Sequence, residues 1–382
     1  MSPLQIGAPG NRMTVKLPVR PDKLVSGSES NLHTTQSVPP GPQQKKSLFD
    51  TIPLPLVMFL AKPYLAGQTS SAAISKAHDI FQSRKFTGTL DILGEDATTV
   101  EDCERYVTTY MSLIDEVTAS QLHTSNRKER LTISMKPSMF STCAPAHGAE
   151  SEKALESAFD RINKIVDYAF QRGVDITLEA EDHRWTNFHL ESYFALYKAG
   201  YKNLGTVIQS RMFRTEKDIA RFEEGMRVRM VIGIYQEPPA IAHTEKPIMK
   251  ELAVRYSREL AHQGVYVELA SHDTKCVENF VSKVVLPLKL KSSQFEFQFL
   301  LGVPRAKLQD GLVNGSYFSE MSQSLSGDDE KHALMLAQTG AIVRMYLPYG
   351  KDKVAGPYCR RRLKNNPNMI AYGIKNVLGL QS

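Results

Sequence analysis

The sequence predicts a (β/α)8 barrel, an α/β fold of the TIM-barrel type. Eight runs of strand length, most of them rich in β-branched or aromatic residues, recur between Gly88 and Tyr349. A helix-like stretch follows each run, and about 260 residues for eight such repeats is a usual length for this barrel. The runs are Thr89–Leu93, Leu131–Met135, Asp175–Ala180, Leu204–Gln209, Val228–Tyr235, Val265–Ser271, Phe295–Leu301 and Ala341–Leu347.

The helices around these runs have recognisable positions. Glu101–Ala119 follows the first strand, and a helix over residues 150–172 is expected to end at Gly173, a residue type favoured just after a helix. A final helix is expected near residues 356–365. Barrels of this kind place their chemistry at the C-terminal ends of the strands, so polar residues there are candidates for a site.

The barrel and its flanking segments divide the chain into four parts. These are a disordered basic tail at 1–46, N-terminal helices at 47–86, the barrel at 87–370 and a C-terminal tail at 371–382. Residues 1–47 contain six basic and two acidic side chains, so most of the formal net charge of +6 lies in the first tail. The remainder has no basic stripe of the kind that nucleic-acid binding requires.

The cysteines and the apolar segments exclude several other classes. Four cysteines lie far apart without a Cys-x-x-Cys pair, which indicates reduced thiols and predicts neither a disulfide framework nor a metal site. No apolar run reaches 18 residues, so the sequence predicts no membrane span. The ten-residue segment Ile52–Ala61 either packs against the barrel, which we favour, or lies on a membrane surface.

Polar residues at the predicted strand ends are the candidates for chemistry. The sequence contains no Walker A loop, no Gly-x-Gly-x-x-Gly after a strand, no His-Glu-x-x-His and no Gly-x-Ser-x-Gly. Each remaining candidate alone has a structural explanation of about equal weight. Together they suggest one polar pocket, because an unpaired buried charge is costly. The candidates are Lys136, Glu179, Gln209, Arg229, His272 and Tyr346.

Two arginines in the predicted last helix are a further candidate. Arg361 and Arg362 would project about 100° apart, so two guanidinium groups can reach one space. A guanidinium matches a carboxylate with two parallel hydrogen bonds and stays charged when buried. Without further context, a solvated basic helix end is the preferred explanation of the pair.

Six segments resemble the proline dehydrogenase family, of the monofunctional, FAD-dependent type. They follow one another with barrel spacing, and the resemblance extends from about residue 48 to residue 370. The segments are Leu131–Ser138, Leu178–Asp182, Arg227–Val231, Phe295–Gln298, Arg344–Gly350 and Arg361–Leu363. The resemblance implies a distorted barrel with FAD at its C-terminal rim and an eighth helix over the active site. It also implies oxidation of L-proline to Δ1-pyrroline-5-carboxylate, by hydride transfer to flavin N5, with electrons passed to a membrane quinone.

The resemblance assigns expected roles to individual residues. Glu179 and Arg229 would be the catalytic pair, with Arg229 also close to flavin N5. The substrate would contact Lys136, Leu300, Tyr346, Arg361 and Arg362. The cofactor would contact Ala180, Gln209, Arg229, Ile232, Gly233, Ile234, Ser271 and His272. The family further implies a cytoplasmic protein with peripheral contact to the inner membrane, or a mitochondrial one in a eukaryote.

Four positions depart from the family pattern. Glu179 stands where the family has aspartate, Ile232 and Ile234 replace a lysine and an alanine, and Asn365 replaces a glutamate. One hypothesis is that the two isoleucines accommodate the longer carboxylate of Glu179. The departures leave open a diverged flavoenzyme for another cyclic imino acid such as hydroxyproline, a cofactor-free barrel lyase using Lys136, and a non-catalytic proline-binding paralogue.

Overall fold

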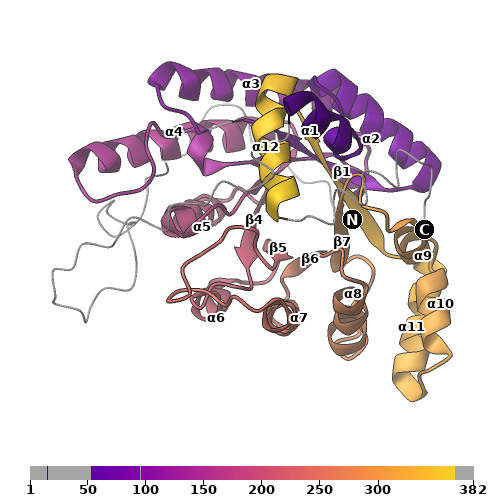
Figure 1. Ribbon diagram of the computed structural model, residues 1–382. Helices are drawn as coiled ribbons and strands as arrows, with labels where there is room; N and C mark the ends of the chain where they lie inside the picture. Colours follow the sequence, from indigo (N-terminus) through magenta and orange to yellow (C-terminus); the bar gives the residue numbers. More distant parts are fainter. Residues whose placement is uncertain (1–14, 16–52, 95, 366–382) are drawn as a thin grey trace.

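A closed barrel of eight parallel strands forms the centre of the computed structural model (Figure 1). The structure describes residues 15, 53–94 and 96–365; the two predicted tails lie outside this range except for Val15. Each strand pairs with the next one along the chain, and β8 pairs with β1 to close the barrel. The strands are β1 Thr87–Ile92, β2 Thr132–Met135, β3 Asp175–Leu178, β4 Leu204–Gln209, β5 Arg227–Val231, β6 Tyr266–Ala270, β7 Phe295–Leu300 and β8 Ile342–Tyr349.

Helices surround the barrel and complete the α/β repeat (Figure 1). The longest, α4, buries an apolar stripe that includes Phe159, Ile162 and Val166. Side-chain caps fix several helix starts, as where Thr99 accepts the Asp102 amide at the start of α3. The helices are α1 Leu54–Ala61, α2 Ser70–Arg84, α3 Val100–Ala119, α4 Ala149–Gln171, α5 His183–Lys198, α6 Thr215–Asp218, α7 Lys246–His262, α8 Thr274–Phe280, α9 Ala306–Asn314, α10 Ser316–Ser322, α11 Gly327–Thr339 and α12 Asp352–Asn365. The predicted (β/α)8 fold is confirmed.

Two environments alternate along the strands. In β7, Phe295 and Phe297 pack with Phe280 of α8, while Glu296 between them forms a 2.7 Å ion pair with Arg344 of β8. Arg227 of β5 likewise pairs with a buried carboxylate of β6 at 2.6 Å. The apolar core therefore lies between strands and helices, and the barrel interior is polar, with charges that must be paired because they are buried.

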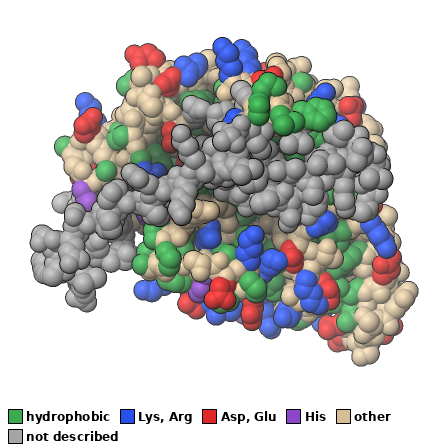
Figure 2. All heavy atoms as spheres, in the orientation of Figure 1, with side chains coloured by type: hydrophobic (Ala, Val, Ile, Leu, Met, Phe, Trp, Pro, Cys, Tyr) green, Lys and Arg blue, Asp and Glu red, His purple; other side chains and the backbone are tan. Residues whose placement is uncertain are grey.

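Helices α1 and α12 lie together over the C-terminal end of the barrel (Figure 1). A separate apolar cluster joins Val57 of α1 and Ala355 of α12 to Leu93 and Leu300, which stand at the ends of β1 and β7. The segment Ile52–Ala61 was expected to pack against the barrel; its described part does so, at the mouth and beside the last helix. No helix among the described residues is long and apolar enough to cross a membrane. On the face drawn in Figure 2, acidic and basic side chains are intermixed.

The fifth predicted strand overruns the observed one by the most residues, and the third, predicted to reach Ala180, ends at Leu178. The fifth strand was expected to reach Tyr235 but β5 ends at Val231, because Gly233 has a positive φ of +93° and turns the chain away from the sheet. The residues after Val231 therefore form part of the loop that leads to α7. This shift matters for the site, since Ile232, Gly233 and Ile234 are rim residues.

Candidate active site

The strand ends bring a set of charged side chains together at the mouth of the barrel. Lys136 follows β2, and its Nζ lies 2.5 Å from Oδ1 of Asp91 on β1. Burial by itself would lower the pKa of Lys136, but the Asp91 carboxylate overrides this effect and raises the pKa. Lys136 is therefore held as a cation, directed across the strand ends by its partner. Asp91 is fully buried, and its Oδ2 accepts no hydrogen bond from a described residue.

A second charged pair lies beside the first. Glu179, directly after β3, accepts hydrogen bonds at Oε1 from the Ser134 hydroxyl of β2 and from Nη1 of Arg229 on β5. Burial would raise the pKa of Glu179, but the Arg229 guanidinium and the Ser134 hydroxyl lower it below its usual value. Glu179 is therefore ionised, and its contacts connect three strands across the barrel.

Arg229 contacts groups on two sides of the mouth. Its Nε lies 3.7 Å from a Glu268 carboxylate oxygen, and its guanidinium carbon lies 5.3 Å from the centre of the Tyr346 ring on β8. Within the described residues, Nε and Nη2 of Arg229 make no hydrogen bond although the side chain is buried. Buried donors without partners are costly, so these two groups are suited to receive acceptor atoms of a ligand.

Gln209 and Gly233 form one wall of the mouth. Gln209 ends β4 and donates from Nε2 to the backbone oxygen of Glu181 at 2.8 Å. Its buried Oε1 has no hydrogen-bond donor among the described residues. A Cβ added to Gly233 would lie 2.5 Å from that oxygen, so only glycine permits this close approach. Arg211 donates to the backbone oxygen of Tyr235 and holds the same loop.

The remaining predicted cofactor residues lie around the rim. Ala180 and Ile232 are half-buried, and Ile232 packs against the main core. Ile234 is 46% exposed, so its side chain lies at the surface of the loop after β5. The hydrogen-bond partners of the Glu179 side chain are Ser134 and Arg229. That Ile232 and Ile234 accommodate the longer carboxylate of Glu179 therefore stays a prediction.

The far side of the mouth is formed by β6, β7 and the loops after them. The Ser271 hydroxyl accepts the Asp273 amide at 3.2 Å, and His272 Nε2 accepts the Leu300 amide at 3.4 Å. Leu300 is buried, and Tyr346 packs against the apolar cluster that contains it, beneath α1 and α12. The two predicted apolar substrate contacts thus lie next to each other.

The two arginines of the predicted carboxylate clamp belong to α12. The helix passes over the mouth, and Tyr358 on it raises the pKa of Tyr346, after the larger effects of burial and of Asp91 and Glu179. The side chains of Arg361 and Arg362 lie outside the described part of the structure. Their role as a clamp therefore stays a prediction.

Three acidic residues of this region were missed by sequence reasoning. They are Asp91, Glu181 and Glu268, all buried. Asp91 and Glu268 each interrupt an apolar strand, Leu90-Asp91-Ile92 and Val267-Glu268-Leu269, and this interruption is the signal that could have identified them. A charge at such a position requires a partner inside the barrel.

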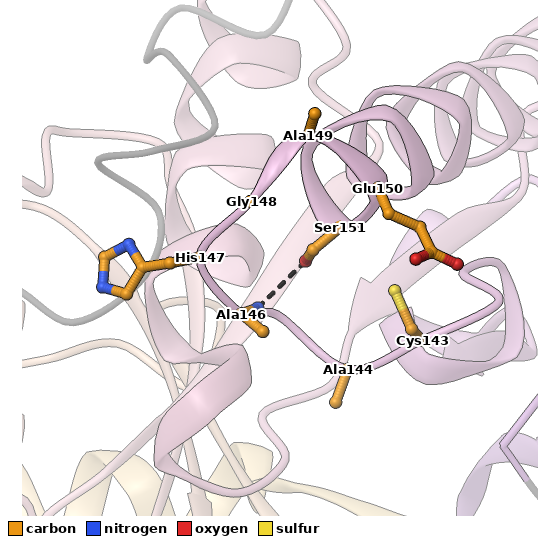
Figure 3. A pocket seen from close by; sticks show the side chains of 8 residues that line it. All are labelled: Cys143, Ala144, Ala146, His147, Gly148, Ala149, Glu150 and Ser151. Atoms are coloured by element: carbon orange, nitrogen blue, oxygen red, sulfur yellow. Dashed lines mark hydrogen bonds between the residues drawn. The ribbon is translucent and has the colours of Figure 1, made fainter.

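A surface hollow lies apart from this cluster, at the start of α4. Ser151 Oγ accepts the Ala146 amide there at 2.9 Å (Figure 3). The hollow measures about 410 Å³, and its walls come from a single stretch of chain without any predicted site residue. Within the described ranges, no group of three His, Cys, Asp or Glu side chains is placed to hold a metal ion. The residues that line the surface hollow are Cys143, Ala144, Ala146, His147, Gly148, Ala149, Glu150 and Ser151.

A (β/α)8 barrel with paired, buried acidic and basic side chains at its C-terminal mouth defines a barrel enzyme. The family profile of proline dehydrogenase matches residues 74–237. Proline dehydrogenase of Deinococcus radiodurans is 26% identical over 321 residues, which cover 84% of this chain and 90% of the relative. Proline dehydrogenase 1 of Bacillus subtilis is 24% identical over 325 residues, or 83% and 90% of the two chains. Over most of its length the chain is thus similar to proline dehydrogenases.

Solved structures with the same fold are larger proteins. Proline utilization A from Bdellovibrio bacteriovorus superposes with a TM-score of 0.63 and 19% identity, over 80% of this chain and 32% of that one. The Bradyrhizobium japonicum protein, as a D779W mutant, gives a TM-score of 0.60 at 19% identity, over 85% and 33%. This chain thus spans about a third of the length of these two proteins, and at this identity the likeness concerns the fold.

Proposed function

We propose that this protein is an FAD-dependent proline dehydrogenase that oxidises L-proline to Δ1-pyrroline-5-carboxylate and passes the electrons to a quinone. The similarity to proline dehydrogenases supports the reaction type, because this chain matches two proteins of that name over 90% of their length. The observation with most weight is the buried guanidinium of Arg229, in which two nitrogens, Nε and Nη2, have no hydrogen-bond acceptor among the described residues at the mouth of the barrel.

The unsatisfied atoms fit the edge of a flavin ring. An isoalloxazine edge has acceptors at N1, O2, O4 and N5 and one donor, N3–H. Arg229 offers donors at Nε and Nη2, and Gln209 offers an acceptor at Oε1; all three atoms are buried and make no hydrogen bond to a described residue. The set therefore has the polarity that an isoalloxazine edge requires, and burial makes leaving these atoms unpaired costly.

Each protein group has a defined part in the proposed reaction. Bound FAD would accept, at N5, the hydride from the ring carbon beside the substrate nitrogen. Arg229 would stabilise the negative charge that develops on the reduced ring, because a fixed cation in a dry site is strongly stabilising. Lys136, held protonated by Asp91, would face the substrate carboxylate together with the predicted arginine clamp. Tyr346 would exclude water from the reacting carbon.

The lyase alternative is disfavoured by the state of Lys136. A Schiff-base lysine must lose its proton readily, which requires a lowered pKa. The pair with Asp91 has the opposite effect and raises the pKa of Lys136. A carbinolamine at this nitrogen would also break the 2.5 Å contact with a buried carboxylate.

Flavin content and dye-coupled oxidation test the proposal directly. The purified or FAD-reconstituted protein should absorb as a flavoprotein and should reduce an artificial dye in the presence of L-proline. Hydroxyproline is the matched comparison for a diverged imino-acid oxidase. A protein that stays colourless after reconstitution with FAD contradicts the proposal. One that binds FAD and proline without reducing the dye is a binding paralogue.

A further inference from the structure

Glu181 is a buried carboxylate that the proposed reaction does not use. It follows β3 by three residues, and its Oε2 accepts the Ser138 backbone N–H at 2.9 Å while its Oε1 accepts the Ser138 hydroxyl at 2.7 Å. No basic side chain of the described residues forms an ion pair with it. The single residue Ser138 therefore satisfies both carboxylate oxygens.

The contacts of Glu181 connect three strand ends. Ser138 lies two residues after Lys136, and the intervening Pro137 has a restricted φ, so fixing Ser138 fixes the direction in which the backbone leaves Lys136. On its other side, the backbone oxygen of Glu181 accepts Nε2 of Gln209 at 2.8 Å. Glu181 thus touches the ends of β2 and β4, where a predicted substrate residue and a predicted cofactor residue stand.

Stability alone does not account for a carboxylate at this position. Burial raises the pKa of Glu181 to about 7, although both Ser138 hydrogen bonds oppose the rise. Among the charged groups near Glu181, Asp96 after β1 raises its pKa and Lys136 lowers it. Glu181 in turn helps to raise the pKa of Arg184 on α5, after the larger effect of Asp182. A neutral glutamine could accept the Ser138 amide and donate to its hydroxyl at a smaller desolvation cost.

We propose that Glu181 is a positioning residue for the site: its carboxylate fixes Ser138 and thereby aims Lys136 at the substrate, while its backbone oxygen orients the Gln209 side chain toward the flavin edge. The inference rests on the proposed function, since it names Lys136 as a substrate contact. It adds a residue that touches neither substrate nor cofactor.

Ionisation of Glu181 should control how firmly Ser138 is held. Hydrogen bonds to a carboxylate are about twice as strong as those to a neutral group. The hold therefore strengthens as the pH rises through about 7, where Glu181 loses its proton. The effect of Glu181 ionisation on the folding stability of the protein has the opposite direction. The unfolded chain releases this proton at a lower pH than the folded one, so the group destabilises the fold as the pH rises toward 7.

Glu181→Gln, which imitates the protonated carboxyl, separates positioning from structural support. In the FAD-loaded wild type, kcat/KM for proline should rise about fivefold through pH 7, given the stronger charged hydrogen bonds. Glu181→Gln should stay at the low-pH level, with a melting temperature at pH 8 that is equal to or above that of the wild type. Asp218→Asn is the matched control, because it removes a buried carboxylate paired with Arg214 on α6, outside the site. It should keep the wild-type pH profile.

Hydrogen exchange at the Ser138 amide gives a readout independent of catalysis. After correction for intrinsic exchange, its protection in the wild type should increase through pH 7, and this increase should be absent in Glu181→Gln. Wild-type protection that does not change with pH overturns the proposal without any variant. So does a parallel loss of activity and melting temperature in Glu181→Gln, which indicates structural support only. If the wild type fails to oxidise proline, the proposed function falls, whereas the exchange result still decides whether Glu181 holds Ser138.

Discussion

Gly233 offers a perturbation whose size can be worked out from the structure. Its φ of +93° is strained for any residue with a side chain, at a cost of about 1–2 kcal/mol. An added Cβ would also lie 2.5 Å from Gln209 Oε1 and 2.7 Å from Cδ of Arg211. Gln209 cannot move aside freely, because Nε2 is bonded to the Glu181 backbone oxygen, and losing that bond costs about 0.5–1.5 kcal/mol more.

Gly233→Ala should therefore destabilise the flavin-free protein by about 1.5–3.5 kcal/mol. Gly327→Ala is the matched control, since Gly327 has a φ of +68° but no described atom lies within 4 Å of the position that an added Cβ would take. That variant should show only the backbone cost, about 1–2 kcal/mol. The difference between the two variants measures the close approach to Gln209.

Urea unfolding of the flavin-free variants and FAD titration are the assays. Displacing the Gln209 amide should weaken FAD binding by about tenfold in Gly233→Ala, which corresponds to one lost hydrogen bond of about 1.4 kcal/mol. Gly327→Ala should bind FAD like the wild type. Equal destabilisation and equal FAD affinity in the two variants would refute both the contact and its role in holding the cofactor.

Two further predictions concern the substrate. Arg361→Met and Arg362→Met should each raise KM for proline by roughly 30-fold or more, because losing one partner of a desolvated charge pair costs about 2–5 kcal/mol. The flavin content should change little. If both variants bind substrate normally, the two arginines are only a solvated basic helix end and not a carboxylate clamp. Glu179→Asp should lower turnover, since the shorter carboxylate retracts from its two hydrogen-bond donors. Activity should return only when Ile232→Lys and Ile234→Ala are added. Additive effects in that mutant cycle would reject an energetic coupling between Glu179 and the two isoleucines.

The barrel was predictable from the sequence because its strands are short apolar runs with turn residues between them. Alternation within a run such as Phe295-Glu296-Phe297-Gln298 also indicates which residues face the helices. The end of β5 was not predictable, since Ile232 and Ile234 prolong the apolar pattern while Gly233 breaks the strand through its backbone angle. A pattern of side chains does not report a φ value.

The sequence predicted where the site residues lie, at the C-terminal ends of the strands, but not which side chains they contact. Lys136, Glu179 and Arg229 lie together because parallel strands place their C-terminal ends on one rim. Their partners were not predictable, because contacts such as that of Lys136 with Asp91 join residues 45 positions apart through the register of the barrel. The same holds for the contact between Glu181 and Ser138, which depends on a turn after β2.

The packing of α1 on α12 has a consequence for how the chain is made. Val57 and Ala61 of α1 are buried by a cluster that includes Ala355 and Cys359, which are synthesised almost 300 residues later. At roughly 5–20 residues per second, α1 waits about 15–60 s for its partner helix. The mouth of the barrel therefore closes only after α12 is made, and the strand ends stay accessible to a ligand until α12 docks.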